Sequence, residues 1–203
     1  MTPPSAEGAL IVFLRSPRKG KVKTRLAESV GSDKAYDIYL KLVHHTLDIV
    51  KTLSCPIYFF IEGDLPALSD RLSSAHYYLQ YEGDLGQRMQ EAFAAVLKKY
   101  AKAVIIGSDC PGLSQSILEQ AFIVLDANDV VLGPATDGGY YLLGCKKINP
   151  ELWSGITWSS SSVLKETIQR CVNKSLTYSL LLELSDIDTL EDYKKHQSFF
   201  EKE

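Results

Sequence analysis

Apolar residues are arranged in two ways along the chain, as short unbroken runs and as longer stretches with helical spacing. The short runs predict strands at 9–14, 56–61, 76–81, 104–106, 130–132, 140–143 and 176–182. Helical spacing predicts helices at 33–53, 65–72, 87–100, 114–126, 162–172 and 189–199. Strands and helices therefore alternate, which indicates the α/β class with a mostly parallel, twisted sheet flanked by helices.

Length and composition favour one folded unit. The chain has 203 residues, of which 45% are hydrophobic and 23% charged, so it can bury a sizeable core. It contains no internal repeat and no low-complexity linker. We therefore predict a single domain over residues 1–203.

The overall charge and the cysteines exclude several classes of protein. The net charge of −3 does not indicate a nucleic-acid-binding surface. No apolar run approaches the roughly 18 residues that span a bilayer, and the N-terminus lacks the regions of a signal peptide. We expect a cytoplasmic protein. No CxxC spacing or paired histidine accompanies the cysteines, which predicts free thiols at Cys55, Cys110, Cys145 and Cys171.

A basic segment follows the first predicted strand. Six of the eleven residues from Arg15 to Arg25 are Lys or Arg, with Ser16, Pro17 and Thr24 among them. Basic side chains this dense repel one another unless an anion lies between them, and a polyphosphate is such an anion. The alternatives are a solvated loop or a patch for an acidic partner. The two standard glycine-rich phosphate loops are absent.

Carboxylates follow two later strands. Asp109 comes just after the strand at 104–106, where a parallel sheet binds ligands and where Mg²⁺ or Mn²⁺ would meet phosphate oxygens. The alternative is that Asp109 caps the next helix. Asp186 and Asp188 face the same side if their segment is extended, and such a pair attracts a cation. Asp188 also has a possible role as the cap of the last helix.

Two glycine-containing segments complete the candidate chemistry. In the first segment, Asp84 is expected to cap the helix that follows it. The functional alternative is that Gly86, Gln87 and Arg88 lie at the N-terminus of this helix and face a ligand. The segment 133–144 places Thr136 and Asp137 before a pair of glycines, which permits close approach of a ligand. The alternative for that segment is a hairpin using Asp-Gly chemistry.

Together, a basic loop and strand-end carboxylates are typical of a site that holds a nucleotide polyphosphate with a divalent metal. The expected chemistry is displacement at phosphorus, or at a sugar carbon with a nucleoside diphosphate leaving. No Ser-His-Asp or Cys-His arrangement is visible. Cys110 lies beside Asp109, which would raise the pKa of the thiol rather than activate it.

Five ordered motifs resemble those of a known family. They are Arg-Ser-Pro-x-x-Gly-x-Val-Lys-Thr-Arg-Leu from 15, Gly-Asp-Leu-Gly-x-Arg-Met from 83, Ile-Gly-Ser-Asp-Cys-Pro-Gly-Leu from 106, Gly-Pro-Ala-x-Asp-Gly-Gly-Tyr-Tyr-Leu-Leu-Gly from 133 and Asp-Ile-Asp-Thr from 186. From residue 9 to about 193 the chain resembles a glycosyltransferase-A-type family of largely uncharacterised bacterial proteins, in the nucleotide-diphospho-sugar transferase superfamily. Its relatives include 2-phospholactate or phosphoenolpyruvate guanylyltransferases and molybdenum-cofactor nucleotidyltransferases.

The resemblance implies that fold and a set of roles. Asp109 matches a metal aspartate, Asp186 and Asp188 match a later acidic pair, and Lys23 and Arg25 match phosphate-binding residues. Thr136, Asp137 and Gly138 would lie near the acceptor. The first loop differs from the Leu-Ala-Gly-Gly type of the sugar-nucleotide and molybdenum-cofactor transferases, so neither the mode of nucleotide binding nor the base carries over.

These observations lead to one main hypothesis. The chain is a transferase that moves a nucleotidyl group from a nucleoside triphosphate to a small phosphorylated or carboxylated acceptor, using Mg²⁺ or Mn²⁺. A glycosyltransferase using a nucleotide-sugar and a non-catalytic nucleotide sensor remain as alternatives, and a homodimer is left open. The expected residues are Asp109, Lys23 and Asp137 for catalysis, Arg15, Ser16, Pro17, Lys23, Thr24, Arg25, Gly86, Arg88 and Ser108 for nucleotide and phosphate, Thr136, Asp137, Gly138 and Gly139 for the acceptor, and Asp109, Asp186 and Asp188 for the metal.

Overall fold

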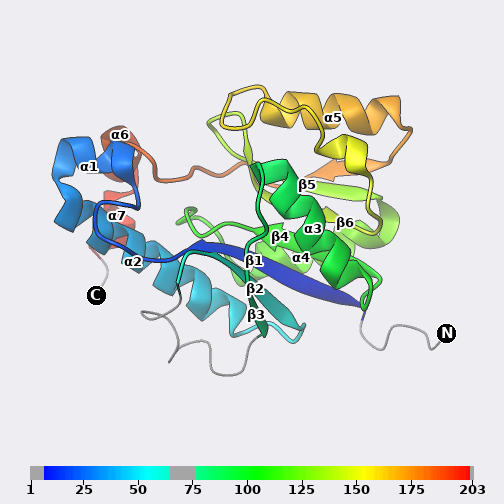
Figure 1. Cartoon of the computed structure of the whole chain (residues 1–203), viewed down its shortest axis with the longest axis horizontal. Helices are drawn as coiled ribbons and strands as arrows, with labels where there is room; N and C mark the ends of the chain where they lie inside the picture. The colour runs from blue at the N-terminus through cyan, green and yellow to red at the C-terminus, as the bar shows by residue number, and fades with distance from the viewer. Residues whose placement is uncertain (1–6, 65–75, 202–203) are drawn as a thin grey trace.

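The computed structural model describes residues 7–64 and 76–201, which form one twisted sheet covered by helices (Figure 1). Within these residues the sheet has seven strands in the order β3-β2-β1-β4-β6-β5-β7. The strands are β1 (Gly8–Arg15), β2 (Ile57–Glu62), β3 (His76–Leu79), β4 (Lys102–Ile106), β5 (Val130–Pro134), β6 (Tyr140–Cys145) and β7 (Tyr178–Leu180). The α/β class and the single flanked sheet are confirmed.

One strand of the sheet departs from the parallel pattern. β6 pairs antiparallel with both β4 and β5, whereas β1 pairs parallel with β2 and β4, and β5 pairs parallel with β7. The turn between β5 and β6 is closed by backbone hydrogen bonds from Ala135 N to Gly139 O and from Gly138 N to Ala135 O, both 3.0 Å. The Asp-Gly segment is therefore a hairpin, and its tip lies at the edge where the parallel strands end.

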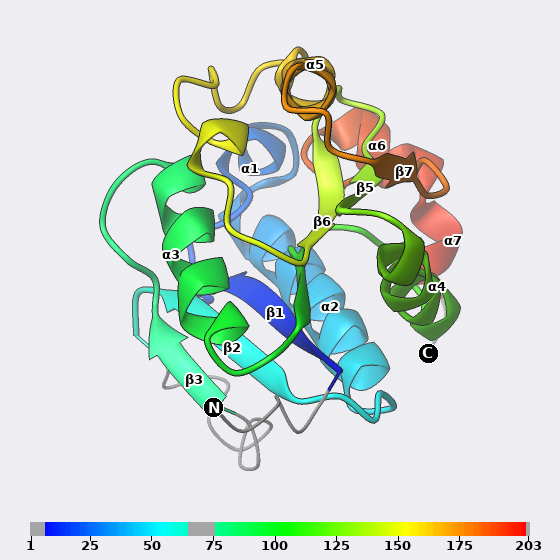
Figure 2. The same ribbon diagram turned by 90° about the vertical axis from the view of Figure 1, so that its right-hand side faces the viewer.

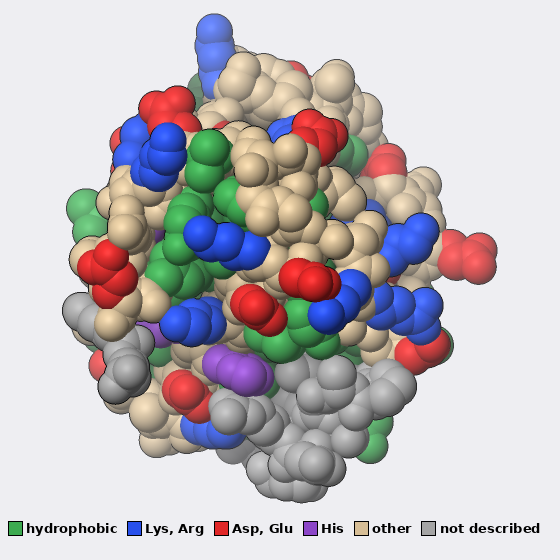
Figure 3. Space-filling model, turned by 90° about the vertical axis from the view of Figure 1, so that its left-hand side faces the viewer, with side chains coloured by type: hydrophobic (Ala, Val, Ile, Leu, Met, Phe, Trp, Pro, Cys, Tyr) green, Lys and Arg blue, Asp and Glu red, His purple; other side chains and the backbone are tan. Residues whose placement is uncertain are grey.

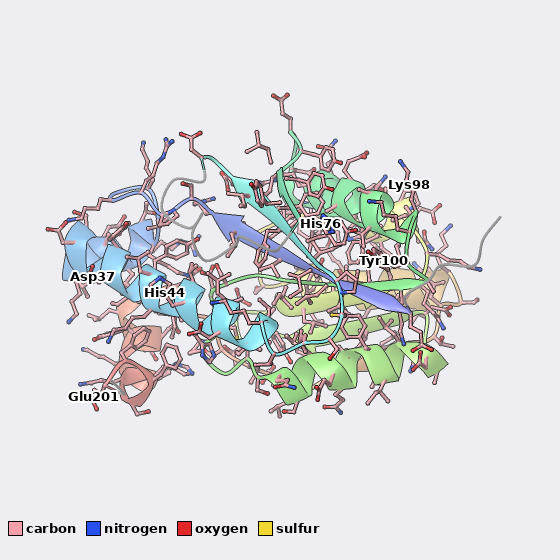
Figure 4. The ribbon with its side chains drawn as sticks, turned by 90° about the horizontal axis from the view of Figure 1, so that it is seen from below. Asp37, His44, His76, Lys98, Tyr100 and Glu201 are labelled. Carbon is pink, nitrogen blue, oxygen red and sulfur yellow. The ribbon has the colours of Figure 1, made fainter. Side chains whose placement is uncertain are left out.

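Helices cover both faces of the sheet. They are α1 (Thr24–Val30), α2 (Ser32–Val50), α3 (Leu85–Leu97), α4 (Gln115–Ala127), the 3₁₀ turn η2 (Pro150–Leu152), α5 (Val163–Asn173), α6 (Leu190–Lys195) and α7 (Gln197–Phe200). α3 and α5 pack on one face, and α2 and α4 on the other (Figure 2). Figure 4 shows α2, which carries the labelled Asp37 and His44, on the same side as α4.

Two helical regions differ from the sequence prediction. The basic segment was expected to be a loop through Arg25, but it ends at Lys23, because Thr24 and Arg25 already form the first turn of α1. The helix predicted at 189–199 is interrupted at His196 and becomes α6 and α7. The helix predicted at 65–72 lies outside the described residues.

The short helices at the carboxyl ends of the strands have a core of their own. α1, α6 and α7 pack with the first half of α2, and Leu26, Ile38, Leu42, Ile187 and Phe200 are buried between them. This cluster lies at the left of Figure 1. Because Leu26 and Ile187 are both buried in it, the segments that carry Lys23 and the Asp186–Asp188 pair are held side by side.

The cysteines, the helices and the surface charges can each be described in general terms. All four cysteines are free, as predicted. No helix in the described part of the chain combines the length and apolarity that crossing a membrane requires. On the face shown in Figure 3, Lys and Arg side chains are interspersed with Asp and Glu side chains rather than gathered into one basic field.

Candidate functional site

A cleft of about 560 Å³ runs along the carboxyl edge of the sheet. It brings together eleven of the predicted site residues, which are Arg15, Lys23, Thr24, Arg25, Arg88, Ser108, Asp109, Asp137, Gly139, Asp186 and Asp188. They come from the ends of β1 and β4, the start of α1, the fourth residue of α3, the β5–β6 hairpin and the segment after β7. Residues far apart in sequence therefore share one cavity, where an open α/β sheet places its ligand.

Lys23 is the most constrained residue of this cleft. Its backbone is left-handed, with φ 49° and ψ 46°, a conformation that is uncommon for a residue with a side chain. Its side chain is only 4% exposed, and Nζ lies 2.9 Å from Oδ1 of Asp109 and 3.1 Å from Oδ1 of Asp188. Although burial opposes the charge, these two carboxylates raise the pKa of Lys23 above its usual value. The ammonium is thus a fixed cation between two carboxylates.

The segment from Leu184 to Asp188 is anchored on both sides. Leu184 N donates to Pro134 O at 3.0 Å, and Ile187 N donates to Asp109 O at 3.0 Å. Ile187 is fully buried, while Asp186 and Asp188, on either side of it in sequence, both line the cleft. The prediction that these two carboxylates face the same side is therefore confirmed.

Asp188 does not cap the last helix, which was the alternative role considered for it. Thr189 caps α6 and forms a capping box with Asp192, whose carboxylate accepts from Thr189 N at 2.9 Å. The Asp188 carboxylate is therefore not used as the cap and is paired with Lys23. By contrast, Asp84 is the cap of α3, as the sequence favoured, because its side chain accepts from Gln87 N at 2.9 Å.

Negative charge is concentrated around Asp186. Burial raises its pKa to about 7, and the nearby charges of Asp109, Asp137 and Asp188 act in the same direction while Lys23 opposes them. Asp109 Oδ1 is buried beside Lys23 but accepts no well-directed hydrogen bond within the described residues. A cluster with more carboxylates than cations is stabilised by an added cation. The donor set, all carboxylate oxygen, is the kind that Mg²⁺ and Mn²⁺ prefer.

The carboxylates do not form a closed metal cage. Across residues 7–64 and 76–201, no three His, Cys, Asp or Glu side chains converge in the way a bound ion requires. At Asp109 and Asp188, the Lys23 ammonium lies between the two carboxylates. The three expected metal residues therefore have suitable chemistry, and their use as ligands stays a prediction.

The cleft is also lined by a hydrogen-bonded group of side chains that the sequence did not reveal in full. Arg15 Nε donates to Glu62 Oε2 at 3.0 Å, and Arg88 Nη1 donates to Gln80 Oε1 at 3.0 Å. Arg88 also lies 3.5 Å from the same Glu62 oxygen, and Gln80 donates to the carbonyls of Leu14 and Phe60. Glu62 and Gln80 each stand at a strand end, which was the available signal for them.

Of the four acceptor residues predicted on the hairpin, two line the cleft and two do not. Asp137 and Gly139 line the cleft, and Asp137 Oδ1 accepts from Gly139 N at 2.8 Å. Gly138 has φ +89° and is packed against the 159–163 segment, since a Cβ there would lie 2.2 Å from Ser161 O. Thr136 is exposed and does not line the cleft; its backbone N–H donates to Leu184 O.

Three nucleotide-site predictions also fall outside the cleft lining. Ser16 and Pro17 are buried. Gly86 is covered by protein, because a Cβ there would lie 2.5 Å from the ring of Trp158. The cleft instead includes Tyr39 and the turn of Trp158, Ser159 and Ser160, none of which was selected from the sequence. Trp158 forms part of the cleft wall.

Cys110 is not an activated nucleophile. Burial raises its thiol pKa to about 12, and the charges of Asp186 and Asp109 add to the effect. The direction agrees with the sequence prediction, but burial is the larger cause. The cleft therefore offers carboxylates and basic groups, rather than a thiolate, as its ionisable groups.

Comparison with protein families identifies the chain at the level of a family. The model of a family described as an uncharacterized protein conserved in bacteria (DUF2064) matches residues 46–160, which is more than half of the sequence. The chain belongs to this family. DUF2064 residues 84–88, 107–113 and 130–145 provide the α3 N-terminus, the Asp109 turn and the hairpin that line the cleft. Among proteins of curated function, no significant match is found.

Several solved structures have the same fold as this chain. A protein from Desulfovibrio desulfuricans G20, named provisionally as a nucleotide-diphospho-sugar transferase, is 30% identical over 97% of this chain and 91% of its own, with a TM-score of 0.86. The 4-diphosphocytidyl-2C-methyl-D-erythritol synthase of Anaerococcus prevotii DSM 20548 is 13% identical over 97% and 99%, with a TM-score of 0.61. Rv0371c of Mycobacterium tuberculosis H37Rv, in complex with manganese, is 15% identical over 92% and 96%, with a TM-score of 0.59.

Proposed function

We propose that this DUF2064 protein is a divalent-metal-dependent transferase that uses a nucleotide donor, and that it transfers a nucleotidyl group from a nucleoside triphosphate to a small phosphorylated or carboxylated acceptor. The observation that carries the proposal is the Lys23 ammonium held between Asp109 and Asp188, with Asp186 and Asp137 around it in one cleft. Nucleotidyl transfer needs this combination of cationic and metal-binding groups, because charge develops on phosphate oxygens.

In this proposal, different residues of the cleft have different roles. Asp109, Asp186 and Asp188 would hold the divalent ion, whose charge would offset the negative charge that develops on the reacting phosphate. Lys23 and Arg25, at the start of α1, bind the phosphate oxygens as a point charge and a bidentate donor. Arg15 and Arg88 line the same cleft and would contact the nucleotide. Asp137, on the hairpin tip, faces the acceptor.

The names of structural neighbours support the donor class. The Anaerococcus prevotii protein is named for cytidylyl transfer, and the Mycobacterium tuberculosis structure contains manganese. The Desulfovibrio desulfuricans protein carries a nucleotide-sugar name, which favours glycosyl transfer as the second candidate. The two candidates differ in the donor consumed and in whether pyrophosphate or a nucleoside diphosphate is released.

The deciding experiment is a thermal-shift panel with Mg²⁺ or Mn²⁺ against the four nucleoside triphosphates, their diphosphates and common nucleotide-sugars. A ligand that binds the folded state raises the melting temperature. We expect a shift with one triphosphate plus metal. A shift only with a nucleotide-sugar would favour the glycosyltransferase, and binding without any product would favour a sensor.

Two Asp→Asn variants test whether the shift comes from this cleft. Asp109→Asn should remove the metal-dependent shift and keep the circular dichroism spectrum. Asp64→Asn is the matched control, because Asp64 is an exposed acid that pairs with Arg18 and does not line the cleft. If Asp109→Asn binds nucleotide and metal as well as the unmodified protein, the proposed function is wrong.

A further inference from the structure

The Lys23 ammonium occupies the space between two of the three expected metal ligands. Its Nζ is 2.9 Å from Asp109 and 3.1 Å from Asp188, and both contacts are to Oδ1 atoms. Each carboxylate is at least 42% exposed as a side chain, whereas Lys23 is 4% exposed. The lysine therefore lies beneath the two carboxylates, inside the site, rather than reaching over them from solvent.

The position of Lys23 is built into the fold. Val22 is 2% exposed and Leu26 is fully buried, so both flanks of Lys23 are anchored in the core. The left-handed backbone at Lys23 is sterically unfavourable for a residue with a Cβ. Burying a lysine side chain also costs rotamer entropy. Residues that the surrounding structure keeps in an unfavourable conformation cluster at functional sites.

A divalent ion and this ammonium cannot share the same two oxygens. Mg²⁺ requires oxygens at about 2.0–2.1 Å, whereas the ammonium holds them at hydrogen-bonding distance, so the carboxylates would have to close around the metal. Two cations at one carboxylate pair also repel each other, and the repulsion is stronger away from bulk water. Metal binding through these two Oδ1 atoms therefore requires Lys23 to move to another anion.

We infer that Lys23 competes with the divalent ion for Asp109 and Asp188, so that metal enters the site together with the nucleotide phosphates and not before them. The inference rests on the proposed function, because it takes those carboxylates as metal ligands and a polyphosphate as the substrate. Phosphate oxygens give the ammonium a new partner, and the vacated carboxylates then accept the metal. The lysine thus prevents tight metal binding in the absence of substrate.

The test is a calorimetric titration of Mn²⁺ into the nucleotide-free protein. Lys23→Met keeps the length of the side chain and removes its charge. We expect this variant to bind Mn²⁺ at least about tenfold tighter than the unmodified protein. Lys21→Met is the matched control, since Lys21 is an exposed member of the same loop and does not line the cleft. It should change the affinity by less than about twofold, as expected for an exposed charge in salt.

A second ligand separates competition from a general change in charge. Inorganic tripolyphosphate, titrated without metal, should bind Lys23→Met more weakly than Lys21→Met, because the proposed new partner of the ammonium is phosphate. Lys23→Gln, which retains hydrogen-bond donors for both carboxylates, replaces Lys23→Met if the latter does not fold by circular dichroism. An Mn²⁺ affinity in the folded variant no higher than that of Lys21→Met overturns the inference.

Asp109→Asn distinguishes failure of the inference from failure of the proposed function. If Asp109→Asn abolishes Mn²⁺ binding while Lys23→Met binds no tighter than the unmodified protein, the metal site stands and only the competition is wrong. If Asp109→Asn has no effect on Mn²⁺ binding, either alone or combined with Lys23→Met, the metal site itself is wrong. The expected result is loss of binding in Asp109→Asn and a gain in Lys23→Met.

Discussion

The hydroxyl of Tyr39 bonds both polar groups of the Arg15 backbone. It accepts from Arg15 N at 3.1 Å and donates to Arg15 O at 2.6 Å. Tyr39 is 3% exposed on α2, and burial raises its pKa to about 12, so the hydroxyl stays neutral and able to donate. Arg15 is the last residue of β1, where the chain leaves the sheet for the basic loop. One tyrosine hydroxyl therefore provides hydrogen-bond partners for both the N–H and the C=O of the strand-end residue at the cleft.

Tyr39→Phe should destabilise the protein by about 1–3 kcal/mol, because it leaves a backbone donor and acceptor of Arg15 without their partner. The measurement is urea unfolding at neutral pH. Tyr36→Phe is the control, since Tyr36 is a partly buried tyrosine of the same helix that contacts Lys19 through its ring. Equal stability losses in the two variants would show that the bonds to Arg15 contribute nothing specific.

The raised pKa of Asp186 predicts how stability depends on pH in metal-free protein. Burial raises this pKa to about 7 in the folded state, above the 3.8 of an unperturbed aspartate. Between these values the folded state binds more protons than the unfolded state, so the free energy of unfolding falls as pH rises from about 4 to about 7. The contribution of Asp186 is fully present below the lower value and is lost above the upper one.

Asp186→Asn should remove this contribution. Relative to the unmodified protein, the variant should gain stability as pH rises from 5 to 8, measured by urea unfolding in the presence of a chelator. Asp33→Asn, at the exposed start of α2, should keep the unmodified dependence because Asp186 is intact. A stability difference that does not change with pH would contradict the assignment.

The alternation of strands and helices could be predicted because the buried runs of β1, β4 and β5 and the apolar stripes of α2 and α4 are strong local signals. The antiparallel direction of β6 was indicated only by the Asp-Gly hairpin considered as an alternative, because its apolar run, Tyr140–Leu143, has no feature that depends on strand direction. α1 was missed because its seven residues include Thr24 and Arg25, which continue the basic composition of the preceding loop.

The site was predictable as a set of residues but not as an arrangement. Asp109 and the Asp186–Asp188 pair were selected because they follow strands, and the fold brings them to one cleft. The ion pairs of Lys23 join residues up to 165 positions apart, and no local pattern encodes such a distance. Its left-handed backbone is equally unpredictable, since lysine has no preference for that conformation.

The conformation of Lys23 predicts an unusual order of stability among its own variants. Lys23→Gly and Lys23→Ala both lose the ion pairs, but glycine adopts φ 49° without steric cost and alanine does not. Lys23→Gly should therefore be about 1 kcal/mol more stable than Lys23→Ala, the reverse of the usual helix-related preference. Urea unfolding measures the difference. An alanine variant as stable as the glycine variant would mean that the left-handed backbone relaxes once the ion pairs are gone.

Gly138 predicts a link between the hairpin tip and the wall of the cleft. Its φ is +89°, and a Cβ would lie 2.2 Å from Ser161 O, so Gly138→Ala must move either the hairpin or the 159–163 segment. Gly155→Ala is the control, because Gly155 also has a positive φ of +69° but open space around its Cβ position. We expect Gly138→Ala to lose at least about 2 kcal/mol more stability than Gly155→Ala in urea unfolding, since backbone atoms leave no room for overpacking. If the two variants are equally stable, the hairpin and the segment that carries Ser159 and Ser160 move independently, and Asp137 is not held in place by this contact.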